Sequence, residues 1–178
     1  MSVSELLILV DENDRPIGSI DKLEAHRTGA RHRAVSVFVF DAQGRVLLQR
    51  RANDKYHSGG KWANTCCTHP RPGESTAAAA SRRLREEMGL ECELIPAGVF
   101  AYECEVGEGL IENEIDHVFV GRANDLPQPN RAEVQEYHWI SIPELARELE
   151  ERPTAFVPWM RMAFEVSRGA AAMEPKRT

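Results

Sequence analysis

The segment from residue 64 to residue 89 constrains the fold and the chemistry of this chain most strongly. It begins with Asn-Thr-Cys-Cys-Thr-His-Pro and ends with Glu-Glu-Met-Gly. Residues 75–88 are rich in alanine and free of proline, which predicts a helix, and Gly89 is placed to end it. A thiol and an imidazole therefore precede a helix whose last turn carries paired acids. This order indicates a site for a metal ion and a diphosphate beside a nucleophile or an acid/base group.

Composition limits the fold to about one domain. The chain has 178 residues, 42% of them hydrophobic, enough to bury roughly 70% of the unfolded surface. We expect residues 1–168 to form a single domain and residues 169–178 to form a flexible tail. A net charge of -6 argues against general nucleic-acid binding, which needs a clustered basic surface.

Cysteine usage and hydropathy indicate where the protein acts. Four cysteines, two of them adjacent, are too few and too irregularly spaced for a disulfide framework. This predicts a reducing, cytoplasmic location. The N-terminal residues lack a signal-peptide pattern, and no apolar run approaches the ~18 residues of a membrane span, so we expect neither export nor membrane insertion.

Expected strands and helices alternate along the chain without repeats or linkers. Strands are predicted at residues 6–10, 35–40, 46–48, 99–106, 111–120 and 134–140, and the apolar run at 35–40 suits a strand buried on both faces. Asp21 can cap a short helix that ends near Gly29. Ser141 opens a helix that stops before Pro153, and a last helix is expected at residues 158–167. The sum predicts an α/β (α+β) fold, a mixed β-sheet covered by helices in an α/β/α sandwich.

A second group of residues indicates a metal site. Glu112 and Glu114 lie two residues apart on an expected strand, so both carboxylates point to the same face. They repel each other unless a cation lies between them. His26, His32 and His69, each by itself more often a surface histidine, complete a set of five nitrogen and oxygen ligands suited to Mn²⁺, Mg²⁺ or Zn²⁺.

Four motifs together resemble a known enzyme family. They are the segment at residues 64–70, the glutamate and arginine pattern of residues 74–90, Glu-Asn-Glu at 112–114 and Pro-Trp-Met at 158–160. This combination resembles the type I isopentenyl-diphosphate isomerases of the Nudix superfamily, from about residue 6 to residue 164. The resemblance implies a Nudix-type fold and an isomerase that converts isopentenyl diphosphate to dimethylallyl diphosphate in isoprenoid biosynthesis.

The resemblance also implies roles for individual residues. Cys67 and Glu114 match the catalytic pair, and Tyr102 and Trp159 match aromatic residues of the active site. One divalent metal, Mn²⁺, Zn²⁺ or Mg²⁺, would be held by His26, His32, His69, Glu112 and Glu114. Glu87 would contribute to a second metal, Mg²⁺ bound with the substrate diphosphate. The family's cationic diphosphate contacts fall on Lys22, Arg51, Lys55 and Arg83. No flavin is implied, the partner is a small isoprenoid diphosphate rather than nucleic acid, and the protein is expected as a monomer or weak homodimer.

The chemistry explains the residue types. Moving an unactivated double bond requires adding a proton at one carbon and removing one at another, through a tertiary carbocation or something close to it. Glu114, with Tyr102, is a candidate proton donor and Cys67, as thiolate, a candidate acceptor. An unperturbed cysteine has a pKa of about 8.5, so His69 or a metal would have to favour the thiolate. The reverse assignment of donor and acceptor stays open.

Two other functions compete with the isomerase. A Nudix pyrophosphohydrolase normally has Arg-Glu where this chain has Arg82 and Arg83, and Thr68 replaces the glycine that opens the usual box. Arg83 removes a carboxylate one helical turn before Glu87, which weakens metal-assisted water activation and strengthens anion binding. A catalytically inactive binding module is the third interpretation, and the retained cysteine, glutamates and histidines argue against it. Asp116 extends the acidic face of its strand and is interpreted as structural.

Overall fold

A computed structural model describes residues 5–55 and 57–173 of the chain, with side chains up to residue 170. Within these ranges, nine strands form one sheet: β1 Leu6–Val10, β2 Pro16–Asp21, β3 His32–Phe40, β4 Val46–Arg51, β5 Trp62–Ala63, β6 Cys66–Thr68, β7 Leu94–Gly107, β8 Leu110–Arg122 and β9 Val134–Ile140. The helices are α1 Lys22–Thr28, α2 Thr76–Met88, α3 Ile142–Glu151 and α4 Met160–Met173, with a 3₁₀ turn η1 at Pro153–Ala155.

Strand β3 lies at the centre of the sheet. It runs parallel to β8, from the pair His32 and Glu114 to the pair Phe40 and Arg122, and antiparallel to β6. Strand β7 pairs with β8 on one side, and β4 carries β9 and β5 on the other. The sheet is therefore mixed, as predicted.

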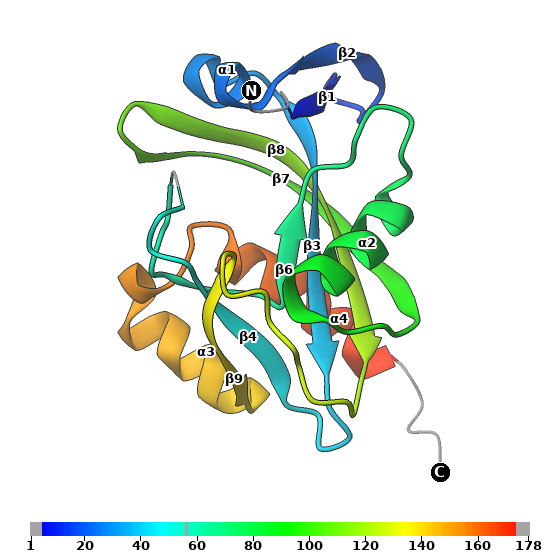
Figure 1. The fold of residues 1–178 in the computed structure, drawn as a ribbon, viewed down its shortest axis with the longest axis vertical. Helices are drawn as coiled ribbons and strands as arrows, with labels where there is room; N and C mark the ends of the chain where they lie inside the picture. Colours follow the sequence, from blue (N-terminus) through cyan, green and yellow to red (C-terminus); the bar gives the residue numbers. More distant parts are fainter. Residues whose placement is uncertain (1–4, 56, 174–178) are drawn as a thin grey trace.

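Helices cover both faces of this sheet (Figure 1). Alanine and leucine side chains of α2 pack against Val35, Val37 and Val39 on one face. Side chains from α3 and α4 pack against Phe38 and Val118 on the other. Both faces of β3 are buried, in agreement with the apolar run at residues 35–40. The alternation of side chains along β3 separates the two cores.

Local signals place several helix ends as predicted. The Asp21 side chain accepts hydrogen bonds from the backbone amides of Leu23 and Glu24, which satisfies donors at the start of α1. Ser75 and Ser141 cap α2 and α3 in the same way. Gly89 ends α2 with φ of 63°, in the left-handed region that favours glycine.

Other predicted boundaries are wrong. Helix α4 begins at Met160 and continues through Met173 instead of covering residues 158–167, so residues 169–173 of the expected tail are helical. The rest of that tail, residues 174–178, lies outside the described residues. Strands β3 and β7 begin earlier than expected, and β2, β5 and β6 were not predicted.

None of the helices described here is long and apolar enough to span a membrane.

Candidate active site

A cleft with a volume of about 290 Å³ opens beside β3, at the small end of the ~300–1,000 Å³ that ligand pockets usually occupy. The residues predicted to contact a diphosphate all line it: Lys22, Arg51, Lys55 and Arg83. The predicted catalytic residues line it as well: Cys67, Tyr102, Glu114 and Trp159. The structure therefore brings the two predicted sets into one cavity.

Four segments supply the predicted metal ligands. His26 lies on α1, His32 begins β3, His69 follows β6, and Glu112 and Glu114 alternate along β8. Because β3 and β8 are paired with His32 opposite Glu114, the first residue of the central strand meets the acidic strand directly. His69, Glu112 and Glu114 line the cleft, while His26 and His32 are completely buried.

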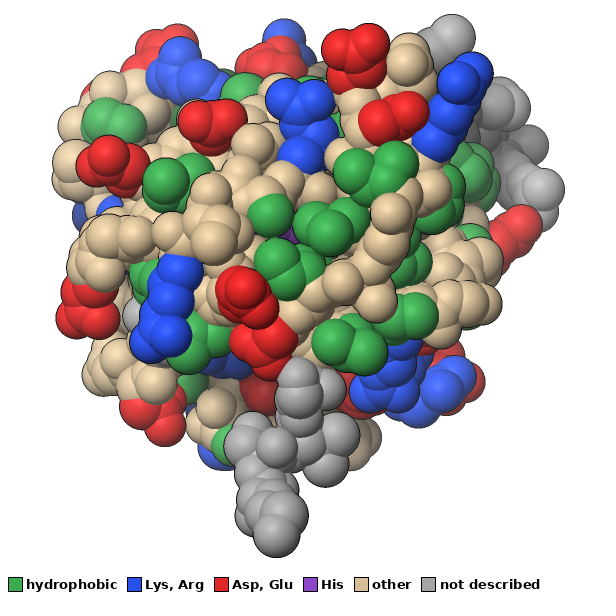
Figure 2. Space-filling view, turned by 90° about the horizontal axis from the view of Figure 1, so that it is seen from above, with side chains coloured by type: hydrophobic (Ala, Val, Ile, Leu, Met, Phe, Trp, Pro, Cys, Tyr) green, Lys and Arg blue, Asp and Glu red, His purple; other side chains and the backbone are tan. Residues whose placement is uncertain are grey.

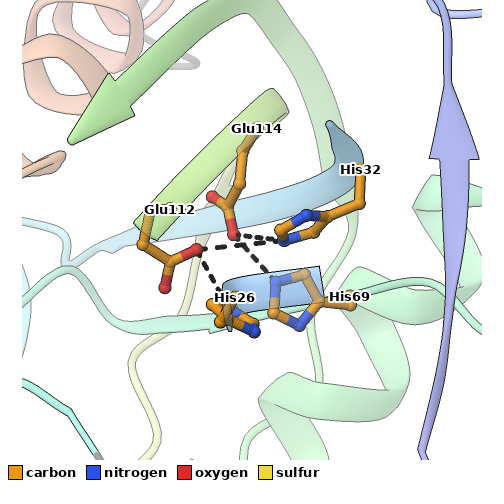
Figure 3. Close-up of side chains that lie close together, drawn as sticks. All are labelled: His26, His32, His69, Glu112 and Glu114. Atoms are coloured by element: carbon orange, nitrogen blue, oxygen red, sulfur yellow. Dashed lines mark hydrogen bonds and ion pairs between the residues drawn. The ribbon is translucent and has the colours of Figure 1, made fainter. Parts of the chain in front are cut away.

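The five side chains converge on one point (Figure 3). One ligand atom from each lies within 4.8 Å of all the others. His26 Nε2 is 3.1 Å from Glu112 Oε2, and His69 Nε2 is 2.8 Å from Glu114 Oε1. His32 Nε2 is 3.3 Å from Glu114 Oε1 and 3.8 Å from Glu112 Oε2. The five predicted ligands therefore lie close enough together to hold one ion.

The hydrogen bonds of the histidines fit a metal ion. The Nδ1 atoms of His26 and His32 face the backbone carbonyls of Lys22 and Ala30, at 2.6 and 2.8 Å. Carbonyl oxygens only accept, so each Nδ1 donates to its carbonyl, and Nε2 is the ring nitrogen that is turned toward the carboxylates and would supply the lone pair to a bound ion. His32 Nε2 is buried and has no hydrogen-bond partner. Lone pairs and carboxylate oxygens that face one another are the donor set of a divalent ion.

The cluster is shielded from solvent. Seen from the end of the molecule that carries α1, β1 and β2, charged side chains of both signs are scattered over the surface and scarcely any histidine shows (Figure 2). Burial acts to raise the pKa of the Glu114 carboxyl, but the neighbouring imidazoles of His32 and His69 outweigh it and hold that pKa well below its usual range. Tyr102 Oη donates to Glu114 Oε2 at 2.6 Å, and burial keeps the phenol protonated by raising its pKa. Glu114 is therefore ionised and held at both oxygens.

Cys67 lies opposite Ser36 of β3 and is partly buried. Burial raises the pKa of its thiol to about 12, although the Arg51 guanidinium acts to lower it. Arg51 Nη1 lies 3.8 Å from Cys67 Sγ. Cys67 is therefore a neutral thiol at pH 7 in the protein without metal, where the sequence interpretation required a thiolate. His69, whose charge was expected to favour the thiolate, contacts Glu114 instead.

The cleft that Cys67 and Glu114 line is also lined by an acid that was interpreted as structural. Asp116 is 1% exposed and accepts a 2.7 Å hydrogen bond from Ser36 Oγ at its Oδ2 atom. Its Oδ1 atom is buried without a hydrogen-bond partner. Burial and the neighbouring Glu114 charge raise the pKa of Asp116 well above its usual value. The two-residue period that links Glu112 to Glu114 also reaches Asp116 and could have indicated its place in the cleft.

The predicted diphosphate contacts form an ion-pair network at the cleft wall. Arg83 Nε lies 2.6 Å from Glu87 Oε1, and Arg83 Nη2 lies 2.8 Å from Glu133 Oε2. Lys55 pairs with the same Glu133 oxygen. Burial acts to lower the pKa of Arg83, but the charges of Glu87 and Glu133 outweigh it and raise that pKa. Glu87 is not part of the five-ligand cluster, and its role in a second metal site stays a prediction.

Trp159 lines the cleft and is 4% exposed. Its Nε1 donates to Asn64 Oδ1 at 3.2 Å, and the Arg51 guanidinium carbon lies 5.8 Å from the ring centroid. The centroid of Tyr102 is 6.3 Å away. The indole is thus fixed by its polar atom, and its rings border the same space as Tyr102.

Several site residues were not identified from the sequence. Gln49 donates to Glu87 and to the carbonyl of Thr65, and Asn64 donates to the carbonyls of Val37 and Cys66. Glu133 holds two cations, and His57 lies against the metal cluster. Asn64 opens the cysteine motif, a signal that could have been used. The other three lie in segments whose partners are distant along the chain, so no local pattern marks them.

Comparisons with known proteins agree with this arrangement. The NUDIX domain family matches residues 30–160. Isopentenyl-diphosphate Delta-isomerase 1 of Aromatoleum aromaticum is 49% identical over 176 residues, covering 99% of this chain and 98% of that protein. Isopentenyl-diphosphate Delta-isomerase 2 of the same organism is 50% identical, covering 89% of this chain and 84% of that protein. The isopentenyl-diphosphate Delta-isomerase of Pectobacterium atrosepticum is 48% identical, covering 89% and 88%.

Solved structures support the fold alone. DR0079 from Deinococcus radiodurans has a TM-score of 0.73 at 23% identity, covering 92% of this chain and 98% of that one. The MutT protein from Methanosarcina mazei Go1 has a TM-score of 0.64 at 23% identity, covering 82% and 96%. The layered sheet and the sequence similarity lead to one conclusion: the chain belongs to the Nudix family and, within it, to the isopentenyl-diphosphate Delta-isomerases.

Proposed function

We propose that this protein converts isopentenyl diphosphate into dimethylallyl diphosphate. The observation that carries the proposal is the placement of Cys67 and Glu114 in one small cleft whose wall carries Arg83 and Lys55. Cys67 lies opposite Ser36 and Glu114 opposite His32, on the two sides of β3 and facing the same side of the sheet. A flat substrate anchored by its diphosphate can therefore lie between two groups able to exchange protons.

The terminal alkene carbon of the substrate gains a proton, which leaves a tertiary cation at the neighbouring carbon. A second proton is then lost from the methylene carbon on the other side of that cationic carbon. One of Cys67 and Glu114 gives the first proton and the other takes the second, so the pair returns to its starting state after exchange with solvent. The tertiary cation formed between these steps is stabilised by the ionised Glu114 and by the π-electrons of Trp159 and Tyr102. Burial of both aromatic residues keeps water from attacking the cation.

The cations bind the other end of the substrate. Arg51, Arg83 and Lys55 present guanidinium and ammonium groups suited to phosphate oxygens. Lys22 also lines the cleft, and its Nζ is 2.8 Å from Glu5 Oε2. We propose that Mg²⁺ accompanies the diphosphate beside Glu87.

The five-ligand cluster is proposed to hold one further divalent ion, Mn²⁺, Zn²⁺ or Mg²⁺. When bound, such an ion supplies fixed positive charge that orients Glu114 and polarises it. His26, His32 and His69 would present nitrogen lone pairs to it, and Glu112 and Glu114 would neutralise its charge.

We also propose a cytoplasmic location, supported by four free cysteines, and a monomer or weak homodimer, which light scattering after gel filtration would test.

Conversion of the proposed substrate tests the function. Purified protein is incubated with isopentenyl diphosphate and Mg²⁺ in D₂O, and NMR follows dimethylallyl diphosphate, deuterium incorporation and released phosphate. We expect isomer carrying deuterium and little free phosphate. Cys67→Ala and Glu114→Gln should each abolish turnover with the fold intact, whereas Cys66→Ala, whose side chain packs in the core on the opposite face, should retain it. Phosphate release without isomer would replace the proposal by a hydrolase.

A further inference from the structure

His57 is buried beside the metal cluster although it lies in the loop between β4 and β5. It is 8% exposed and lines the cleft. Its ring centroid is 5.7 Å from that of His26 and 6.3 Å from that of Trp159. A polar loop residue in this position has lost its hydration, so its polar atoms need partners inside the protein.

Both ring nitrogens of His57 have such partners. Nε2 lies 3.0 Å from Glu112 Oε1, and Nδ1 lies 3.3 Å from Ser58 Oγ. A carboxylate only accepts hydrogen bonds, so Nε2 carries the proton and donates it to Glu112. His57 is not among the five side chains whose ligand atoms lie within 4.8 Å of one another, which distinguishes it from His26 and His32.

The bond from His57 sets the orientation of Glu112. One carboxylate oxygen, Oε1, is held by His57, and the other, Oε2, is thereby directed toward His26 and His32. Partners that hydrogen-bond to a ligating carboxylate fix its rotation, and their removal typically weakens metal binding by about 10–100-fold.

The backbone around His57 connects this bond to the opposite wall of the cleft. Arg51 Nη2 donates to the carbonyl of His57 at 3.4 Å. Lys55, two residues earlier in the same loop, pairs with Glu133, which also binds Arg83. The side chain of His57 is thus a direct link between the metal cluster and the loop that carries a proposed diphosphate contact.

We propose that His57 is a positioning residue that orients Glu112 for metal binding and fastens the loop of residues 52–61 to the metal centre. The proposal rests on the metal centre described under the proposed function. It predicts that metal loading rigidifies a loop whose described residues supply none of the five ligands.

Mn²⁺ binding to metal-free protein, measured without substrate through the electron paramagnetic resonance signal of free Mn²⁺, tests the first half. We expect His57→Ala to raise the Kd by about 10–100-fold. His57→Gln should recover most of the affinity, because its amide can donate from nearly the same position. His138→Ala, at an exposed histidine on β9, is the matched control and should bind as the wild type does. Circular dichroism establishes that each variant is folded.

Amide hydrogen exchange of residues 52–61, followed by mass spectrometry with and without Mn²⁺, tests the second half. Loading should slow exchange in the wild-type protein and in His57→Gln, and should not do so in His57→Ala. Equal Kd and equal protection in wild type and His57→Ala would overturn the role of His57 while leaving the metal centre in place. An equal loss of Mn²⁺ affinity and of loop protection in His57→Ala and His57→Gln would show that the hydrogen bond to Glu112 is not the cause of the effect. If the wild-type protein binds no Mn²⁺, the proposed metal centre itself is wrong, and the role of His57 with it.

Discussion

At the scale of single residues, the protonation state of Cys67 decides what the thiol can do. Its pKa of about 12 keeps it neutral across pH 6–9, because burial penalises the thiolate more than Arg51 favours it. A neutral thiol holds a proton it can give, and must lose that proton before it can take one. A metal bound nearby would shift this balance toward the thiolate.

Alkylation measures this state directly. In metal-free protein we expect iodoacetamide to modify Cys67 slowly at pH 7.5, with a rate that rises about tenfold per pH unit through pH 10, because only the thiolate reacts. Mass spectrometry of peptides distinguishes Cys67 from the other three cysteines. A rate that levels off near pH 8.5 would contradict the raised pKa. Faster modification after Mn²⁺ loading would indicate that the ion favours the thiolate.

Arg83 distinguishes the isomerase chemistry from the hydrolase chemistry of this fold. Its Nε binds Glu87 at 2.6 Å, so a cation occupies the place where a hydrolase has a second carboxylate. We expect Arg83→Ala to raise KM for isopentenyl diphosphate by roughly 10- to 100-fold, the equivalent of a charge-assisted hydrogen bond of about 1.5–3 kcal/mol. Arg83→Glu should be worse, since it adds repulsion. Steady-state kinetics with isopentenyl diphosphate measures KM for both variants.

Arg85→Ala is the control for this series, since Arg85 is exposed and pairs only with Glu91 among its described contacts. Its KM should stay unchanged. Rapid phosphate release from a nucleoside diphosphate derivative by the wild-type protein would show that Arg83 does not exclude hydrolysis.

At the scale of elements, the end of α2 fixes the position of the cleft wall. The backbone carbonyls of Glu87 and Met88 accept hydrogen bonds from the amides of Asn130 and Gln128, each at 2.8 Å. The segment after β8 is thereby attached to the helix, and it leads directly to Glu133. Gly89 permits this contact, because a Cβ at residue 89 would lie 2.8 Å from the carbonyl oxygen of Gln128.

A pair of glycine substitutions separates the cost of a left-handed backbone from the cost of the steric contact with Gln128. Gly44 also has a positive φ, 74°, but nothing lies within 4 Å of its hypothetical Cβ. Gly44→Ala should therefore cost only the left-handed backbone, about 1–2 kcal/mol. Gly89→Ala adds overpacking of about 1–3 kcal/mol. Urea denaturation measures both, and equal losses would mean that the contact with Gln128 relaxes freely.

The elements that could be predicted from the sequence are those with local signals. Asp21, Ser75 and Ser141 mark helix starts, and the run at residues 35–40 marks the central strand, because caps and long apolar runs act within a few residues. Strands β5 and β6 have two and three residues and exist only through pairing with β4 and β3. Helix α4 passes Gly169, because this glycine does not adopt the positive φ with which Gly89 ends α2.

At the scale of the whole molecule, the metal cluster joins segments from residue 26 to residue 114. Its ligands come from α1, β3, the loop after β6, and β8. Sequence spacing could place Glu112 and Glu114 on one face, but the convergence of three distant histidines followed only from the family resemblance. His57 belongs to no pattern, since its contact with Glu112 depends on how a loop folds back.

An ion that binds only the folded chain stabilises it by mass action. At a Mn²⁺ concentration of 100 times Kd, the gain is about 2.7 kcal/mol, or a rise in Tm of about 5–10 °C for a protein of this size. We expect this shift in the wild-type protein by calorimetry and its loss in His69→Ala, which removes a partly exposed ligand. His138→Ala should keep the full shift. An equal Mn²⁺-dependent rise in Tm in His69→Ala would show that the ion binds outside the five-ligand cluster.

The unbroken pairing of β3 with β8 has a consequence for how this enzyme can change over generations. The two strands match residue for residue from His32 and Glu114 to Phe40 and Arg122. A codon inserted or deleted between Asn113 and Asp116 would turn the following side chains to the opposite face, so that Val118 and Val120 would exchange places with His117 and Phe119. A change of length in the β7–β8 turn alters neither face. Descendants of this sequence can therefore vary by substitution within the acidic strand, while gains and losses of residues are confined to the turns.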